Sequence, residues 1–236
     1  MADAPQPNQK FDGYARDYDR LLEDSIRASG ESKEYFLQYK LDCLERLGVN
    51  FDAPLLDYGC GVGNLSHKLA ERFARVEGYD PSPESLAVAR RQSSRVTFHH
   101  ETSTLEDGKF STAVLSGVLH HVPPPEREAV MSTVRQKLAP GGKVVVFEHN
   151  PWNPVTRRAV ADCEFDDDAI LLWPGELRGL LRASGYADVR LEYIVFFPRP
   201  LAALRPLEPR LAWLFMGAQT MTIGTQPSAG THSART

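Results

Sequence analysis

Along most of this 236-residue chain, short apolar runs alternate with longer stretches. In the longer stretches, apolar residues recur every three or four positions. The short runs are typical of buried β-strands and the longer stretches of amphipathic α-helices. Strands are predicted near residues 54–58, 76–79, 96–99, 112–116, 143–148, 189–197 and 213–224. Helices are predicted near residues 31–47, 64–74, 83–92, 125–138 and 174–184. This alternation predicts an α/β fold, a parallel sheet with helices on both faces.

The alternating pattern stops near both ends of the chain. Residues 1–9 are polar and proline-rich, and residues 226–236 are rich in Ser, Thr, Gly and Ala, so both ends are predicted to be disordered. Residues 10–225 contain no internal repeat, and 42% apolar residues suffice for a core. We therefore expect a single domain over residues 10–225.

A glycine-rich turn, Leu56-Asp57-Tyr58-Gly59-Cys60-Gly61-Val62-Gly63-Asn64, follows the first predicted strand. Its glycines allow positive φ angles and a close approach of ligand to backbone. A dinucleotide fingerprint needs its third glycine where this chain has Asn64 or Ser66, so a nicotinamide cofactor is disfavoured. The carboxylate of Asp57 would repel a pyrophosphate, whereas N–H groups at the helix start suit a carboxylate or a hydroxyl. A ligand that carries both an ammonium and a carboxylate fits better.

An acid at the end of the second predicted strand completes a strand-turn-helix-strand unit that begins with the first predicted strand. Asp80 lies 21 residues after Gly59, close to the roughly 20 residues expected for a carboxylate that binds ribose hydroxyls. Pro81 and Ser82 follow it, with Ser82 in an N-cap position for the next helix. The alternative is that Asp80 is only a solvated acid at a strand end.

Two further segments follow this unit along the chain, and the order and spacing of all these features are specific. The segments are Val114-Leu115-Ser116-Gly117-Val118-Leu119-His120-His121-Val122 and Leu138-Ala139-Pro140-Gly141-Gly142-Lys143. Together, these features make the chain resemble a class I S-adenosylmethionine-dependent methyltransferase, most closely the small-molecule enzymes grouped with the quinone and natural-product methyltransferases. The resemblance implies a Rossmann-like, doubly wound seven-stranded sheet with an antiparallel last strand, and S-adenosylmethionine as cofactor. It also implies an N-terminal helical lid at residues 10–47 and an acceptor-site insertion at residues 148–173.

The resemblance and the local chemistry give a set of candidate cofactor-binding residues. By resemblance, Ser116 and Gly117 line the methionine part, and an acid near the third strand meets the adenine amino group. The aromatic faces of Tyr14 and Tyr18, four residues apart, suit the sulfonium cation, with packing as the alternative. The full set is Tyr14, Tyr18, Lys40, Asp57, Gly59, Cys60, Gly61, Asn64, Asp80, Pro81, Ser82, Glu101, Thr102, Ser116, Gly117 and His121.

Candidate catalytic residues are His149, His121 and Glu148. A histidine can take a proton from a hydroxyl or amine at neutral pH, and Glu148 could orient His149 or bind substrate. Adjacent histidines point different ways on a helix or strand, so at most one of His120 and His121 is expected to reach the site, by resemblance His121. The alternative for all of these residues is a structural role, satisfying backbone groups.

No metal site is predicted, because His149 and Glu148 alone provide too few ligands for zinc. The acidic run Asp162, Glu164, Asp166, Asp167 and Asp168 is interpreted as a solvated face, with divalent-metal or cationic-substrate binding as alternatives. Three widely spaced cysteines fit neither a disulfide framework nor a C-x-x-C site.

Composition narrows the partners further. A formal net charge of −4 gives no general attraction to nucleic acid, and no window resembles a membrane span or a signal peptide. We therefore expect a cytoplasmic monomer or homodimer that methylates O, N or C of a small-molecule acceptor. The alternatives are an enzyme that uses the cofactor in a cyclisation or elimination, and a non-catalytic methyltransferase-like subunit; a nicotinamide oxidoreductase is the weakest.

Overall fold

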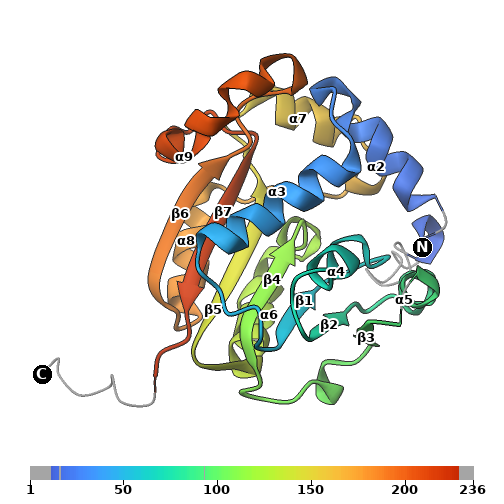
Figure 1. Cartoon of the computed structure of the whole chain (residues 1–236), viewed down its shortest axis with the longest axis vertical. Helices are drawn as coiled ribbons and strands as arrows, with labels where there is room; N and C mark the ends of the chain where they lie inside the picture. The colour runs from blue at the N-terminus through green and yellow to red at the C-terminus, as the bar shows by residue number, and fades with distance from the viewer. Residues whose placement is uncertain (1–11, 16, 93, 229–236) are drawn as a thin grey trace, which may run out of the picture.

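The computed structural model describes residues 12–15, 17–92 and 94–228 and contains one seven-stranded sheet (Figure 1). The strand order is β3-β2-β1-β4-β5-β7-β6, and β7 runs antiparallel to both of its neighbours. The strands are β1 Leu55–Tyr58, β2 Val76–Tyr79, β3 Val96–His99, β4 Phe110–Ser116, β5 Leu138–His149, β6 Ala187–Ile194 and β7 Gln219–Thr225. The predicted fold class is confirmed, including the antiparallel last strand. Disorder was predicted for residues 1–9 and 226–236, of which residues 1–9 and 229–236 lie outside the described residues. Gln226 is described and hydrogen-bonded: its N–H donates to the Gly142 carbonyl at 2.7 Å, and its carbonyl accepts the Gly141 N–H at 2.9 Å.

Helices cover both faces of the sheet because successive strand residues point to opposite sides (Figure 1). Leu55 packs in a core with α3, α4 and α5, whereas Leu56 packs in a second core with α6 and α8. The helices are α2 Tyr18–Ile26, α3 Lys33–Arg46, α4 Asn64–Leu69, α5 Pro83–Gln92, α6 Arg127–Lys137, α7 Pro154–Ala161, α8 Pro174–Ala183 and α9 Glu208–Leu211. None of these helices, and none elsewhere in the described residues, is long and apolar enough to cross a membrane.

Strand order reverses between β1 and β4, which places a crevice at the carboxyl ends of these strands. From β1 the chain crosses to β2 and β3 on one side, and then returns to β4 and β5 on the other. The turns after β1, β2, β4 and β5 therefore meet at one edge of the sheet. The N-terminal helices α2 and α3 lie near this edge, and α2 packs on α7.

The last two strands are shorter than their sequence pattern predicts. β6 ends at Ile194, and Val195 takes a positive φ of 60°. Residues 213–218 form turns instead of the predicted strand, because the Asn150 side chain donates hydrogen bonds to the carbonyls of Phe215 and Gly217, both at 2.7 Å. A local strand pattern is overridden here by a buried side chain from another segment.

Candidate functional site

A cavity of about 300 Å³ opens at the carboxyl ends of β1, β2, β4 and β5. Its wall combines the glycine turn, the ends of these strands, the 3₁₀ turn Leu119–His121 and the helices α2 and α3. Most of the predicted cofactor-binding residues line it: Tyr18, Lys40, Asp57, Gly59, Cys60, Gly61, Asn64, Asp80, Pro81, Ser116, Gly117 and His121. The candidate catalytic residues Glu148 and His149 line it as well.

The glycine turn is shaped by positive φ angles of 78° at Gly59 and 53° at Gly61. The N–H groups of Gly59 and Cys60 both donate to the carbonyl of Tyr79, at 2.7 and 2.9 Å, which fixes the turn against β2. A Cβ at Gly59 would come within 2.6 Å of the Val118 side chain, whereas a Cβ at Gly61 would meet nothing within 4 Å. The turn therefore exposes bare backbone at Gly61 to the cavity, as a closely approaching ligand requires.

Two buried acids flank this turn. Asp57 accepts a hydrogen bond from Ser66 Oγ at 2.6 Å, and burial raises the pKa of Asp57 to about 6. Asp80 accepts hydrogen bonds from the N–H groups of Gly61 at 2.7 Å and Ser82 at 2.9 Å. Burial raises the pKa of Asp80 too, and these two hydrogen bonds oppose that rise. Both carboxylates border the cavity, where they suit the ammonium and hydroxyl groups of a ligand.

Lys40 of α3, one of the predicted cofactor-binding residues, brings a positive group to the cavity wall. Its ammonium lies 6.0 Å from the centre of the Phe147 ring. Burial lowers the pKa of Lys40 to about 8, and the nearby Asp57 and Glu148 oppose that decrease. A half-buried cation, Lys40, and a buried anion, Asp57, thus lie on the wall of one cavity.

Four predicted cofactor-binding residues do not line the cavity: Tyr14, Ser82, Glu101 and Thr102. The helical turn at residues 12–14 ends before α2 begins, so Tyr14 and Tyr18 do not share one helix, and Tyr14 packs near Leu21 and Cys163. Ser82 instead caps α5 by accepting the N–H of Ser85 at 3.1 Å. Glu101 is exposed and bonded to Ser103 Oγ at 3.2 Å, where it precedes the 3₁₀ turn Thr102–Thr104.

Glu148 binds His120, not the His149 that the sequence suggested. Its side chain is 2% exposed; Oε1 accepts the N–H of Leu119 at 2.7 Å, and Oε2 lies 2.6 Å from His120 Nδ1. These contacts hold the 3₁₀ turn against the end of β5. Although burial acts to raise it, the pKa of Glu148 lies below its usual value because His120 stabilises the carboxylate.

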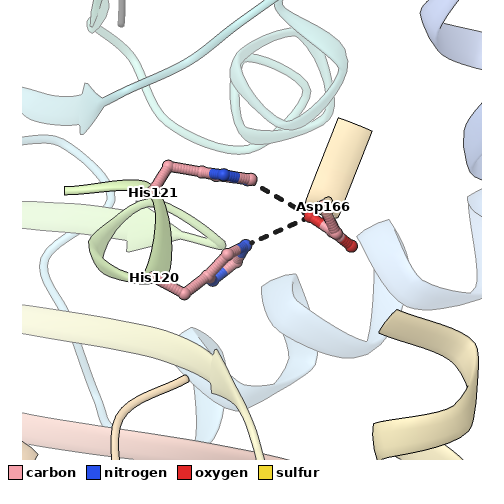
Figure 2. A group of neighbouring side chains, drawn as sticks. All are labelled: His120, His121 and Asp166. Carbon is pink, nitrogen blue, oxygen red and sulfur yellow. Dashed lines mark ion pairs between the residues drawn. The ribbon is translucent and has the colours of Figure 1, made fainter. Parts of the chain in front are cut away.

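Both adjacent histidines reach the cavity, so the expectation that at most one would do so is wrong. His120 and His121 lie on the 3₁₀ turn Leu119–His121, and their ring centres are 4.1 Å apart because both rings turn toward one carboxylate from another segment. Figure 2 shows both imidazoles directed toward Asp166. The Nε2 atoms of His120 and His121 lie 3.5 and 3.3 Å from Asp166 Oδ1.

Asp166 departs from the solvated acidic face that its sequence context predicted. It is 7% exposed and lines the cavity, whereas Asp162 and Asp167 of the same run are exposed. Nothing in the run singles out Asp166 by sequence, because its partners lie more than forty residues earlier in the chain.

Burial and neighbouring charges shift the pKa values of the ionisable side chains in this part of the wall. Burial acts to lower the pKa of His120, but Glu148 and Asp166 outweigh it and raise the pKa to about 10. Burial, reinforced by His120, lowers the pKa of His149 to about 4, so His149 is neutral at neutral pH. His120 and His121 together hold the pKa of Asp166 well below its usual value, against the effect of burial. The wall thus offers a neutral imidazole beside a charged one.

Further cavity residues were not identified as site residues from the sequence. Leu22, Ile26, Phe36 and Leu37 come from α2 and α3 and make part of the wall apolar. Helical spacing is the signal that could have found them, but a stripe of this kind is equally typical of a helix packed on a core.

The comparisons with known proteins agree with this geometry. A family model described as a methyltransferase domain matches residues 11–191. The chain therefore belongs to this family of methyltransferase domains, and the resemblance to class I S-adenosylmethionine-dependent methyltransferases is confirmed. The enzyme class and the cofactor predicted from the sequence are those of the family.

The alignments with individual relatives cover only part of each relative's length. An uncharacterized methyltransferase of Staphylococcus carnosus is 28% identical over 58% of this chain and 65% of its own. A ubiquinone biosynthesis O-methyltransferase of Xanthomonas euvesicatoria is 34% identical over 63% of this chain and 67% of its own. The aligned regions therefore span about two-thirds of these relatives.

A solved structure extends the likeness to nearly the whole fold. A methyltransferase of Thermotoga maritima, described as a possible histamine N-methyltransferase, superposes with a TM-score of 0.68 over 94% of this chain and all of that one. The two sequences are 18% identical, so this match supports the fold alone.

Proposed function

We propose that this methyltransferase transfers a methyl group to a hydroxyl oxygen of a small, largely apolar acceptor. The observation that carries the proposal is the mixed wall of the cavity beside the glycine turn. The helices α2 and α3 contribute apolar side chains, and the segments after β4 and β5 contribute imidazoles and carboxylates. An apolar body with one weakly acidic hydroxyl matches both parts of this wall.

The names of similar proteins support an oxygen acceptor. The relatives of Xanthomonas euvesicatoria and Cereibacter sphaeroides, 34% and 31% identical, are named ubiquinone biosynthesis O-methyltransferases. As part of the proposal, the chain acts in the cytoplasm in small-molecule biosynthesis, as a monomer or homodimer.

Bound S-adenosylmethionine supplies an electrophilic methyl group on a positively charged sulfur. In our proposal, Asp57 and Lys40 hold the amino-acid end of the cofactor, and Asp80 binds its ribose hydroxyls. Orienting two reactants in this way lowers a barrier by about 7–11 kcal/mol in favourable cases. An imidazole nitrogen of His149 or His121 accepts the acceptor's hydroxyl proton, which contributes about 10²–10⁴-fold.

The test is an assay of the purified chain with S-adenosylmethionine and a panel of hydroxylated aromatic and aliphatic acceptors. We expect equal amounts of a methyl ether and S-adenosylhomocysteine, measured by mass spectrometry. His149→Ala is expected to lower kcat by about 10²-fold or more without changing cofactor affinity. The matched control is His100→Ala, because His100 is exposed and lies outside the cavity. Products methylated only on nitrogen or carbon, or converted without S-adenosylhomocysteine, would contradict the proposal.

A further inference from the structure

We infer that His120, His121 and Asp166 form a binding site for one divalent transition metal ion of the zinc or iron type. The candidate ligand atoms of the three residues all lie within 4.8 Å of one another. Figure 2 shows the two imidazoles facing the carboxylate, and all three residues line the cavity. The role of the ion rests on the proposed function, since the ion would bind the acceptor oxygen. The presence of the ion does not depend on that function.

The spacing of the donor atoms fits a shared ion better than direct hydrogen bonds. Asp166 Oδ1 lies 3.3 Å from His121 Nε2 and 3.5 Å from His120 Nε2, beyond the 2.7–3.2 Å typical of N–H···O hydrogen bonds. Two ligand atoms about 2.1 Å from a tetrahedral ion are about 3.4 Å apart. Although the Asp166 side chain is buried and lines the cavity, its Oδ1 accepts no hydrogen bond.

The surroundings of His120 are those of a metal ligand. A ligating histidine usually directs its second ring nitrogen at a carboxylate, which fixes the orientation of the ring. Glu148 Oε2 lies 2.6 Å from His120 Nδ1, and Asp168 Oδ1 lies 3.5 Å from His121 Nδ1. Glu148 therefore fixes the His120 ring with its Nε2 directed at Asp166, and the Nε2 of His121 faces the same carboxylate.

Charge favours the same assignment. Glu148 and Asp166 are carboxylates that are 2% and 7% exposed, and buried charges are costly unless paired. One charged imidazole can balance only one of these carboxylates, whereas a divalent ion held by neutral imidazoles would balance both. Two imidazoles and one carboxylate suit Zn²⁺ or Fe²⁺ rather than Mg²⁺, which prefers oxygen ligands.

Three protein ligands leave at least one coordination position for another molecule, as in catalytic zinc sites. All three residues line the cavity, so this position is accessible to an acceptor. A hydroxyl bound there would lose its proton more readily, because a bound cation stabilises the oxyanion. Since His121 would then be a ligand, His149 remains the candidate base.

The experiment measures metal uptake by the full-length, untagged chain. After chelation and dialysis, we expect Zn²⁺ and Fe²⁺ to bind with one ion per chain in calorimetric titration and elemental analysis, and Mg²⁺ not to bind. His121→Gln and Asp166→Asn should abolish the binding. Glu148→Gln, which removes the charge behind His120, should weaken it by about 10–100-fold. The matched controls are His100→Gln and Asp162→Asn, which change exposed residues outside the cavity.

Wild-type-like circular dichroism and thermal unfolding would show that each variant is folded. Wild-type protein that takes up no zinc or iron, or Asp166→Asn protein that binds these ions like the wild type, would overturn the inference. Metal uptake without methyl transfer to any hydroxyl would refute the proposed acceptor and leave the metal site intact. Methyl transfer by a chain that takes up no metal would refute the metal site alone.

Discussion

Replacing Gly61 by alanine separates cofactor binding from the stability of the turn. Gly61 has a φ of 53°, and an added Cβ would meet no protein atom within 4 Å. Gly48 provides a matched control, because its φ is 63°, its added Cβ also meets nothing within 4 Å, and it lies outside the cavity. A non-glycine residue in this conformation costs about 1–2 kcal/mol. We expect both variants to lose about that much free energy of unfolding, measured by denaturant titration.

Only Gly61→Ala should impair cofactor binding. Its methyl group points into space that the protein leaves empty beside the cavity, so the bound cofactor would be its only close neighbour. We expect the affinity for S-adenosylmethionine to fall at least about tenfold, which corresponds to about 1.4 kcal/mol, as measured by isothermal titration calorimetry. Gly48→Ala should bind like the wild type. A Gly61→Ala protein with wild-type affinity would place the cofactor away from the turn and refute the reasoning.

Three further substitutions test other parts of the structure. Asp80→Ala should weaken S-adenosylmethionine binding about tenfold or more in calorimetry, since two ribose hydroxyls lose their acceptor; unchanged affinity would contradict the assignment. Because the pKa of Lys40 is about 8, Lys40 loses its charge as pH rises through that value. The affinity should therefore fall over this range, whereas Lys40→Arg, which stays protonated, should remove the pH dependence. Asn150→Ala should lower the free energy of unfolding by about 2–4 kcal/mol in denaturant titration, because two backbone carbonyls lose their donor.

The cofactor side of the cavity could be predicted because its determinants are local. The turn from Asp57 to Asn64 and the acid Asp80 belong to one strand-turn-helix-strand unit, in which spacing along the chain fixes spacing in the fold. Predictions from the sequence were wrong for Tyr14 and Glu101. The spacing of Tyr14 from Tyr18, and for Glu101 the family resemblance, suggested contact with the cofactor. The break between residue 14 and α2, and the exposed position of Glu101, keep both outside the cavity.

Side-chain contacts between distant segments override local pattern elsewhere. The segment 213–218 has the apolar residues of a strand, yet the buried Asn150 amide binds two of its carbonyls and holds it in turns. No property of residues 213–218 reveals that partner.

The acceptor side depends on such contacts throughout. Taken alone, Glu148 is an acid at a strand end, His120 is half of a histidine pair, and Asp166 is one acid in a run of five. In the fold each explains the next: Glu148 is buried and requires a cation or donor, His120 meets that need through Nδ1, and its Nε2 is thereby directed at Asp166. Because each group is positioned by the preceding one, a substitution at Glu148 should alter the geometry at Asp166 without touching it. The chemistry of the acceptor side is therefore a property of the assembled cluster, which is why a single-residue reading of the sequence identified the methyl donor but placed Asp166 on the solvated surface.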